Sequence, residues 1–537
     1  MRDSHQIEEM DLLVIGGGIT GAGIAQDAAA RGLKTVLVEK GDFASGTSSR
    51  SSKQIHGGLR YLEHFSLGLM KESISERHTL TRLAPGLVRW TPFLIPYFRG
   101  KEKRWRTSLG LWLYDNLART PAGLRHRVLN ASEILGYAPE LRRDGLLGGA
   151  HFYDCLTDDA RLVLSLALDA QSRGALVCNH VAVEAPIREH GKTAGALVRD
   201  VLNGQSWTIR ARQVVVATGP WTDTTLNLLG EAADHEKIRP AKGVHIVLPR
   251  SRLNLNHVVL IPSVRDRRFL FVIPWYEGIV VGTTDTEYHE APDEVRPERA
   301  DVNYILDAMN WSFPEARIAA GDLVCSYAGI RPLINVPGKE TSDVPREYKL
   351  FETEGGVISV AGGKLTTYRR MAKAVVDRVV RRLKSTNKDL LVMPCWTHRI
   401  PLGHPPEDEF NPFKQTDLPE DIRNHLIADY GVWTEQVVSF LQSNSSLSRR
   451  MVPELPYILA EAYYAVTYEK ARTLEDILVR RTRVALLDPA RGRGCAREVA
   501  TLVAPELNWS AEDIERQIEL YERAIKTRFC GPEDFVN

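Results

Sequence analysis

The stretch that decides the fold is "LLVIGGGITGAGIAQDAAARGLKTVLVEK", residues 12–40. It opens with a short apolar run, Leu12 to Ile15, which favours a buried parallel strand, and continues into an Ala-rich helical segment. Between the two, Gly16, Gly18 and Gly21 have the spacing G-x-G-x-x-G. The first glycine permits a tight turn, the second lets the backbone approach a pyrophosphate, and the third lets the helix pack closely. The N-terminus of the helix then points at the anion.

A second strand is predicted at Thr35 to Val38, after the helix ends near Gly32. It is followed by Glu39, whose carboxylate suits hydrogen bonds from a ribose hydroxyl and would repel a 2'-phosphate. A lone G-x-G-x-x-G is weak evidence, because glycine turns also serve ordinary strand–helix packing. Here strand, turn, helix, second strand and acidic residue are all in register. The stretch therefore predicts a dinucleotide site that disfavours NADP and leaves both FAD and NAD open.

Length and composition bound the class of protein. A chain of 537 residues should form two or three domains. Its 69 Lys and Arg against 68 Asp and Glu indicate neither a nucleic-acid nor an acidic partner. The start "MRDSHQIEEM" lacks the apolar core of a secretory signal, and no apolar run is long enough to span a membrane. The six cysteines are scattered, so we expect no metal site and reduced thiols in a cytosolic protein.

The rest of the chain divides by its patterning. Residues 243–285 contain several strands without helices between them, which predicts a mostly antiparallel second domain. Residues 355–384 give a strand, a Gly-Gly turn and an amphipathic helix, which indicates a return to the nucleotide domain. We predict a discontinuous nucleotide domain (1–85, 150–225 and 350–384), a substrate or cap domain (86–149 and 226–349), a linker (385–415) and a C-terminal helical domain (416–537).

Eight motifs resemble, in the same order, those of the aerobic, quinone-linked FAD-dependent glycerol-3-phosphate dehydrogenases, which are membrane-associated. They are "GGGITGAGIAQDAAARGL", "SSKQIHGGLRYLEH", "DDARLVL", "ATGPWTD", "KGVHIVLPR", "GTTDTEY", "YAGIRPL" and "GGKLTTYRRMA". They cover much of residues 11–375, and 473–488 resembles the helical C-terminal domain of the family. The resemblance implies an α/β fold in which a glutathione-reductase-like FAD-binding Rossmann domain is interleaved with a mostly antiparallel β substrate domain, followed by a C-terminal helical domain.

The resemblance also implies the cofactor contacts. FAD would place its pyrophosphate at the glycine turn of residues 16–21 and its ribose at Glu39. The helix after Lys364 would point its positive end at the flavin, where it can stabilise the negative charge gained on reduction. The other residues expected at the cofactor are Ser51, Ser52, Gly57, Gly219, Gly362, Gly363, Leu365 and Thr366.

A glycerol phosphate carries nearly two negative charges, so its pocket should contain several cations. By the resemblance, Arg60 and Lys364 bind the phosphate, with Tyr61 nearby. Arg331 and Arg346 lie closer to flavin N5 and to the reacting hydroxyl. An isolated arginine is more often part of a solvated or structural ion pair, but these cations all fall within or beside the matching motifs.

The expected chemistry is oxidation of a secondary alcohol, in which C2 gives a hydride to flavin N5 and the hydroxyl proton passes to a base. His56 in "QIHGGLR" is the candidate base, because imidazole titrates near neutral pH. An equally good interpretation is a histidine that only hydrogen-bonds the cofactor or its own loop. Asp285 in "GTTD" and His245 in "KGVHIV" are interpreted as structural.

The leading prediction is a dehydrogenase that converts sn-glycerol 3-phosphate to dihydroxyacetone phosphate and passes the electrons to a membrane quinone. A close rival is an oxidase that uses dioxygen and makes hydrogen peroxide. An amine or amino-acid oxidase would need a carboxylate clamp instead of these cations. A flavin-binding scaffold without turnover is disfavoured by the intact "HGGLRY" and "GGKLTTY" motifs. We expect a cytoplasmic protein held peripherally on the inner face of the membrane, with a homodimer left open.

The stretch "FRGKEKRWRTSLGLWLYDNLAR", residues 98–119, is the candidate membrane contact. A cluster of basic residues precedes apolar residues at helical spacing, and Thr107 or Ser108 would cap the helix. Such a segment can lie in an anionic lipid interface. The alternative is a helix packed on the protein core behind a solvated basic loop. The apolar positions are Leu109, Trp112, Leu113 and Leu117.

Overall fold

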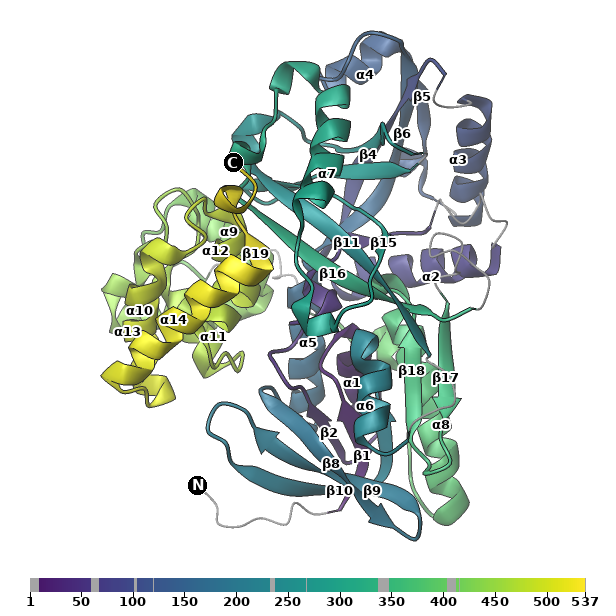
Figure 1. The fold of residues 1–537 in the computed structure, drawn as a ribbon, viewed down its shortest axis with the longest axis vertical. Coiled ribbons are helices and arrows are strands. Elements are labelled where there is room, and N and C mark those ends of the chain that lie inside the picture. Colours follow the sequence, from purple (N-terminus) through teal and green to yellow (C-terminus); the bar gives the residue numbers. More distant parts are fainter. Residues whose placement is uncertain are drawn as a thin grey trace.

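The structure is a computed structural model with three parts: a mainly parallel sheet, a larger antiparallel sheet and a helical domain at the C-terminus. Figure 1 shows the first sheet at the bottom, the second above it and the C-terminal helices at one side. The residues that the structure describes are 9–58, 67–100, 104–118, 120–231, 237–266, 268–336, 347–402, 412–414 and 416–536.

The first sheet has the strand order β17-β18-β10-β1-β2-β7, and β8 and β9 extend it as an antiparallel ribbon from β10. The pairings from β18 through β10, β1 and β2 to β7 are all parallel. Every residue of β1 and β2 is buried, as expected for a parallel sheet with both faces covered. The strands are β1 Met10–Ile15, β2 Thr35–Val38, β7 Leu176–Cys178, β8 Val181–Glu189, β9 Lys192–Asp200, β10 Ser206–Val216, β17 Tyr348–Glu352 and β18 Ile358–Gly362.

Three helices form the main layer against this sheet: α1 (Ile19–Ala30), α5 (Asp159–Ser172) and α8 (Tyr368–Thr386). The Ala-rich α1 packs against both α5 and α8. A Cβ atom on Gly23 of α1 would lie 2.8 Å from Cδ2 of Tyr368, so α8 could not approach as closely if this residue had a side chain. The short helix α6 (Thr222–Leu228) follows β10. The strand–turn–helix units predicted around residues 12–40 and 355–384 are therefore confirmed.

The second sheet has the order β19-β16-β11-β14-β13-β12-β4-β6-β3, with β15 paired to β11 and β5 to β6. All of its described pairings are antiparallel except β4 with β12, which confirms the antiparallel character predicted for residues 243–285. The exact domain boundaries stay predictions. The strands are β3 Gln54–Ile55, β4 Val88–Phe98, β5 Arg127–Leu129, β6 Leu146–Thr157, β11 Ile238–Pro249, β12 Val258–Pro262, β13 Phe269–Trp275, β14 Gly278–Gly282, β15 Thr286–Glu287, β16 Cys325–Ile334 and β19 Phe529–Cys530.

Four helices pack on the second sheet: α2 (Leu67–Leu83), α3 (Arg104–Ala118), α4 (Ala131–Tyr137) and α7 (Arg299–Ser312). The cap predicted at Thr107 or Ser108 is wrong, because α3 already begins at Arg104 and both residues lie inside it. Among the described residues, no helix combines the length and the apolar character needed to cross a membrane.

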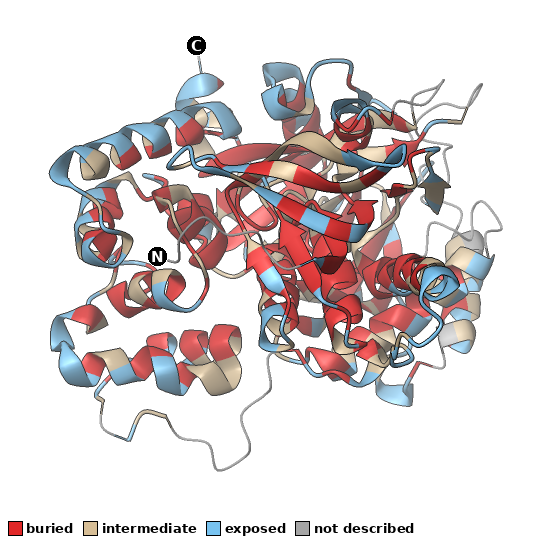
Figure 2. Cartoon of the chain, turned by 90° about the horizontal axis from the view of Figure 1, so that it is seen from below, coloured by how far each residue is buried: buried red, intermediate tan, exposed pale blue. Residues whose placement is uncertain are grey.

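The C-terminal helices pack around an apolar core that is continuous with side chains of the second sheet, such as Val247 and Trp275, and Figure 2 shows their outer faces exposed. They are α9 Glu420–Tyr430, α10 Thr434–Ser443, α11 Leu459–Thr467, α12 Val484–Leu487, α13 Arg493–Leu507 and α14 Ala511–Arg528. Buried arginines join them to the first domain. The π-helical turn Asp476–Arg481 brings Arg480 and Arg481 onto the carboxylate of Asp42, with N–O distances of 2.6 and 2.7 Å. Asp42 lies in the loop that begins at Glu39, so buried ion pairs join the C-terminal domain to the predicted nucleotide site.

Candidate active site

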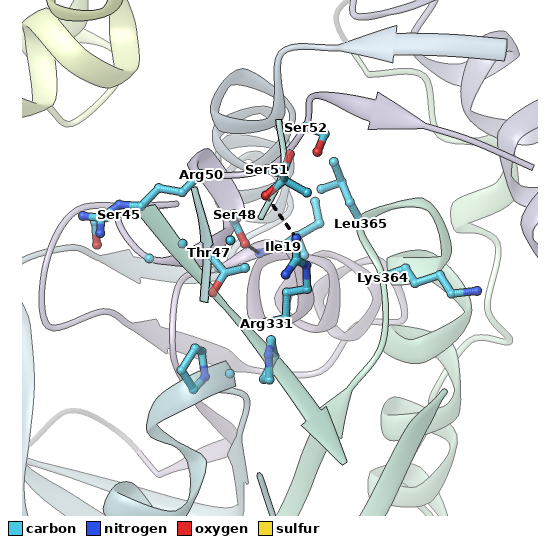
Figure 3. Close-up of a pocket in the computed structure, with 18 of the residues that line it drawn as sticks. Ile19, Ser45, Thr47, Ser48, Arg50, Ser51, Ser52, Arg331, Lys364 and Leu365 are labelled. Carbon is cyan, nitrogen blue, oxygen red and sulfur yellow. Dashed lines mark hydrogen bonds between the residues drawn. The ribbon is translucent and has the colours of Figure 1, made fainter. Parts of the chain in front are cut away.

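A cavity of about 3090 Å³ runs between the two sheets and brings together most of the residues predicted for the site. Figure 3 shows the loop from Ser45 to Ser52, Arg331 and Lys364 around it. Gly21 and Gly57 do not line the cavity, but the residues that precede them, Thr20 and His56, do. The predicted residues that do line it are Gly16, Gly18, Glu39, Ser51, Ser52, His56, Gly219, Arg331, Gly362, Gly363, Lys364, Leu365 and Thr366.

The glycine turn after β1 has the geometry that a pyrophosphate needs. Gly16 has a φ of +109°, and a Cβ there would lie 2.6 Å from the carbonyl oxygen of Ala217. A Cβ on Gly21 would lie 1.7 Å from the carbonyl oxygen of Gly16, so only glycine lets α1 start so close to β1. Gly18 is the N-cap of α1 and makes no side-chain cap. The N-terminus of α1 faces the cavity, where the backbone N–H of Ile19 donates to Oγ of Ser48 at 2.9 Å, and the residues fit a dinucleotide.

Glu39 lines the cavity at the end of β2. Its Oε2 accepts a hydrogen bond from the backbone N–H of Gly17 at 2.7 Å, and its Oε1 accepts one from Gly41 at 2.8 Å. Burial raises the pKa of this carboxyl above its ordinary value, against the two backbone hydrogen bonds, which lower it. The carboxylate thus joins the glycine turn to the following loop, and its contact with a ribose stays a prediction.

Two further glycine turns reach the cavity. Gly219 has a φ of +55°, and Gly362 and Gly363 have values of +77° and +93°. A Cβ on Gly362 would lie 2.3 Å from the carbonyl oxygen of Glu347. The 3-10 turn Leu365–Thr367 then leads into α8, so the positive end of this helical segment is directed at the cavity.

Lys364 connects this third turn to α2, and Thr366 connects it to the loop of His56. The Lys364 Nζ lies 3.5 Å from Oγ of Ser73 on α2. The Thr366 hydroxyl oxygen accepts a hydrogen bond from the backbone N–H of His56 at 3.2 Å. Both residues line the cavity. The structure therefore brings Lys364 and His56 to one wall, although 308 residues separate them in the sequence.

Arg331 enters the cavity from β16. Its Nη1 donates to Asp285 Oδ1 at 2.9 Å, and its Nη2 donates to Thr283 Oγ1 and to the Thr284 carbonyl, both at 3.1 Å. A Cβ on Gly243 would lie 2.6 Å from Nη2, so the glycine of "KGVHIV" leaves room for the guanidinium. Asp285, which was interpreted from the sequence as structural, orients Arg331 and also lines the cavity.

His245 is a cavity residue that the sequence analysis interpreted as structural. It is buried on β11, and its Nε2 lies 2.8 Å from the hydroxyl oxygen of Ser52. Its ring stacks on Tyr327 with a centroid distance of 5.1 Å, and its Nδ1 has no hydrogen-bond partner in the described part of the chain. Burial, and then the positive charges of Arg331 and Lys53, hold the pKa of His245 well below its ordinary value. This imidazole is therefore neutral at neutral pH, and the same surroundings oppose its protonation.

Three predicted site residues lie outside the described residues: Arg60 and Tyr61, expected to bind the substrate, and Arg346, expected to be catalytic. Ser51 has a second role beside lining the cavity, because its hydroxyl donates to Asp159 Oδ2 at 2.6 Å. Lys53 donates to the other oxygen of the same carboxylate at 2.6 Å. The Ser-rich loop is thus held from behind by a buried ion pair, which short-range patterning did not reveal.

One cluster has the residue types of a metal site. Ligand atoms of Asp42, His180 and Asp476 lie within 4.8 Å of one another and are buried. Arg480 donates to both carboxylates, and His180 Nε2 lies 2.9 Å from Asp476 Oδ2. Guanidinium groups therefore already occupy the positions where a cation would balance these carboxylates.

Comparisons with known proteins agree with this geometry. Residues 11–377 match the sequence model of the family described as "FAD dependent oxidoreductase", and residues 395–514 match that described as "C-terminal domain of alpha-glycerophosphate oxidase". The glycerol-3-phosphate dehydrogenase of Mycobacterium leprae (strain TN) is 38% identical over 98% of this chain and 90% of its own length. The chain belongs to the family of FAD-dependent glycerol-3-phosphate dehydrogenases. The predicted family and its cofactor, FAD, are thereby confirmed.

A second relative and a solved structure support the same assignment, and a more distant structure shares the fold. The aerobic glycerol-3-phosphate dehydrogenase of Staphylococcus aureus (strain USA300) is 34% identical over 97% of this chain and 95% of its own. The structure of the glycerol-3-phosphate dehydrogenase from Bacillus halodurans complexed with FAD superposes with a TM-score of 0.79 at 32% identity, covering 99% of this chain and 96% of that one. This similarity confirms the predicted fold class. The L-alpha-glycerophosphate oxidase of Mycoplasma pneumoniae, with a TM-score of 0.55 at 19% identity, shares the fold over 70% of this chain and 95% of that one.

Proposed function

We propose that this glycerol-3-phosphate dehydrogenase family member oxidises sn-glycerol 3-phosphate at C2 to dihydroxyacetone phosphate and passes the electrons to a membrane quinone. The observation that carries the proposal is the pairing of two cations, Arg331 and Lys364, with three glycine turns in one cavity. The turns suit a dinucleotide, and the cations suit a phosphorylated substrate in a chain whose overall charge is only +1.

The chemistry of each side chain indicates its role in the reaction. Lys364, together with Arg60, binds the phosphate, since an ammonium group acts as a strong point charge. Arg331 presents a planar fork of N–H donors, already oriented by Asp285, to the oxygen on C2. FAD, when bound, supplies the acceptor for the hydride that leaves C2. Arg346 is assigned to the same oxygen by the family resemblance.

The hydroxyl proton of the substrate needs a base, and we assign it to His56. This residue lines the cavity on the wall that carries Lys364, and its backbone is fixed by Thr366. His245 is the second candidate, because its unprotonated imidazole lines the same cavity, but burial and the nearby cations Arg331 and Lys53 oppose its protonation. Single substitutions of the two histidines would distinguish His56 from His245 as the base.

The experiment that tests the function is anaerobic titration of the purified protein with glycerol 3-phosphate. We expect a yellow protein whose noncovalent FAD is released on denaturation and whose flavin absorbance is bleached without added NAD. The matched control is glycerol, which lacks the phosphate and should leave the spectrum unchanged at equal concentration. A colourless protein that needs NAD for turnover would contradict the assignment.

The proposal also names the electron acceptor, a membrane quinone. An exposed apolar face of α3 supports a membrane acceptor: the side chains of Leu109 and Trp112 are 56% and 57% exposed. Leu109 and Leu113 also line the cavity, so this face continues toward the site. Near-stoichiometric hydrogen peroxide per substrate oxidised in air, with no stimulation by a quinone analogue, would favour the oxidase alternative.

A further inference from the structure

The carboxylate of Asp154, on β6, joins the helices α2 and α3 to the loop that carries His56. Arg77 of α2 donates through Nη1 to Asp154 Oδ1 at 2.9 Å, and the hydroxyl of Tyr114 of α3 donates to Oδ2 at 2.9 Å. Arg77 also donates to the Tyr114 oxygen at 2.7 Å, which closes a triangle of three side chains. The backbone N–H of Gly57 donates to the same carboxylate, 3.3 Å from each oxygen.

The triangle is almost fully shielded from solvent. The exposed fractions of Arg77, Tyr114 and Asp154 are 0%, 1% and 3%. Burial raises the pKa of Tyr114 well above its ordinary value, so its hydroxyl stays protonated and able to donate. Hydrogen bonds to a charged acceptor in such surroundings are strong, and an unmatched donor or acceptor there is costly. The three side chains therefore hold one arrangement.

The helices α2 and α3 contact Gly57 directly as well as through the carboxylate of Asp154. A Cβ on Gly57 would lie 2.2 Å from the Tyr114 hydroxyl oxygen and 2.9 Å from Ile74, so the backbone of this glycine packs against both helices. On its other side His56 donates to Thr366 of the third glycine turn. The His56–Gly57 backbone is thus held between two supports, the Asp154 carboxylate and the Thr366 hydroxyl, and both residues line the cavity.

We propose that Asp154, oriented by Arg77 and Tyr114, is a positioning residue for the dehydrogenation, because it fixes the His56–Gly57 backbone at the cavity wall. Arg77 and Tyr114 do not line the cavity and would act only through Asp154 and Gly57. A displacement of about 1 Å in a catalytic group can cost two orders of magnitude in rate. The inference rests on the role proposed above for His56.

The test uses the FAD-loaded full-length enzyme and the variants Tyr114→Phe and Asp154→Asn. Tyr114→Phe keeps the ring and removes the hydroxyl that orients the carboxylate. Asp154→Asn keeps the shape but places an amide where Tyr114 needs an acceptor. We expect kcat to fall about tenfold or more in Tyr114→Phe and further in Asp154→Asn, with the KM for glycerol 3-phosphate within about threefold and full FAD content.

The second measurement is hydrogen exchange of the peptide that covers residues 54–58, made without substrate. We expect exchange there to become about fivefold faster or more in Tyr114→Phe, with exchange in α5 unchanged. The control is Tyr430→Phe, which removes another buried tyrosine hydroxyl that donates to a carboxylate, that of Glu461 at 3.1 Å, away from the cavity. Tyr430→Phe should lower the thermal midpoint of unfolding without changing kcat or the exchange rate of residues 54–58.

The outcomes separate the two proposals. Unchanged exchange at residues 54–58 in both variants would overturn the positioning role, whatever the activity. Faster exchange with an unchanged kcat would also overturn it, because the triangle would then be structural only. If the parent enzyme fails to oxidise glycerol 3-phosphate, the proposed function fails, while the exchange measurement still decides whether Asp154 holds the loop.

Discussion

The guanidinium of Arg331 is held by the carboxylate of Asp285, with 2.9 Å between Nη1 and Oδ1. This ion pair is largely buried, since the two side chains are 19% and 10% exposed. The carboxylate fixes the plane of the guanidinium fork, and Thr283 and the Thr284 carbonyl fix its second nitrogen. The geometry of this cation, and not only its charge, is therefore what the site presents to a substrate.

Arg331→Lys should lower kcat/KM for glycerol 3-phosphate by about 100-fold, although it preserves the charge. An ammonium group cannot satisfy Asp285 and the substrate oxygen with the same planar geometry. Steady-state kinetics would measure the effect. The matched control is Arg265→Lys, which alters an exposed pair with Asp307 outside the cavity and should be silent. Equal activity in Arg331→Lys and the parent would remove Arg331 from the site.

Lys364→Ala should raise the KM about tenfold to a hundredfold and leave kcat within a few-fold. The loss corresponds to about 1.5–3 kcal/mol for a hydrogen bond to a charged group that binds the phosphate similarly in the ground and transition states. Lys373→Ala on the exposed side of α8, where the ammonium pairs with Asp377, is the control. A large fall in kcat at unchanged KM would instead place Lys364 at the reacting carbon.

His56→Asn and His245→Asn distinguish the two candidate bases. If His56 is the base, its variant should keep FAD and lose about 10²- to 10⁴-fold in kcat. His245→Asn should then have the smaller effect on kcat. Loss of FAD from His56→Asn would support the alternative in which His56 only binds the cofactor or its loop. A larger rate loss in His245→Asn than in His56→Asn would transfer the assignment to His245.

The stability of the second domain should fall in mild acid because of His151. Burial, and then the neighbouring His257 and Arg127, lower the pKa of His151 from 6.5 to about 4. Between these values the unfolded chain binds a proton that the native chain does not, so stability decreases as the pH falls from 6.5 toward 4. His151→Phe, which can keep the ring contacts with Tyr137 and His257, should reduce this loss.

The check on this pH dependence is the thermal midpoint of the parent and the variant at pH 7 and pH 5. The difference between the two pH values should be smaller in His151→Phe than in the parent. His190→Gln, at an exposed position in the turn after β8, should behave like the parent. An identical pH response in all three proteins would show that His151 does not titrate in this way.

Lys101→Glu, Lys103→Glu and Arg104→Glu together should abolish sedimentation with anionic vesicles and slow quinone reduction, while activity with a soluble dye persists. Lys101 and Lys103 lie outside the described residues, but Leu109 and Trp112 of the following helix are exposed in the structure. At about 1 kcal/mol per basic residue near an anionic surface, the cluster would change partitioning by orders of magnitude.

The control for the membrane prediction reverses three exposed charges elsewhere: Arg497, Arg516 and Lys526 on α13 and α14, each changed to Glu. This variant has the same change in net charge and should still sediment. If the variant in residues 101–104 sediments like its parent at low salt, the stretch 98–119 is not the membrane contact. The alternative interpretation, a helix packed on the core behind a solvated loop, would then hold.

The nucleotide-binding half of the protein was predictable from the sequence because its requirements are local. A turn that tight, a helix start that close to a strand and a carboxylate at the end of the next strand must all fall within residues 12–40. The structure bears this out in the contacts of Gly16 and Gly21. Lys364 and Arg331 were likewise found through short motifs, and the cavity brings them together.

Other parts of the site depend on pairs of residues that no local pattern joins. His245 stands in an apolar strand, where a buried structural histidine is the natural interpretation, and only the fold places it beside Ser52, 193 residues earlier in the chain. Arg481 reaches Asp42 across 439 residues. In α3, helical spacing indicated an apolar stripe but not which of its residues would be exposed, because packing against α2 and β6 decides that.

The residue patterns by themselves thus determined the dinucleotide site and the two kinds of sheet, since periodicity and glycine spacing act over a few residues. The family resemblance supplied FAD and the expected cations of the substrate pocket. Only the tertiary structure decided which distant groups complete the site: Asp285 for Arg331, Ser52 for His245, and Tyr114 with Asp154 behind Gly57. The physical reason is that a buried polar group must find a partner in space, and the chain supplies that partner from whichever element packs there.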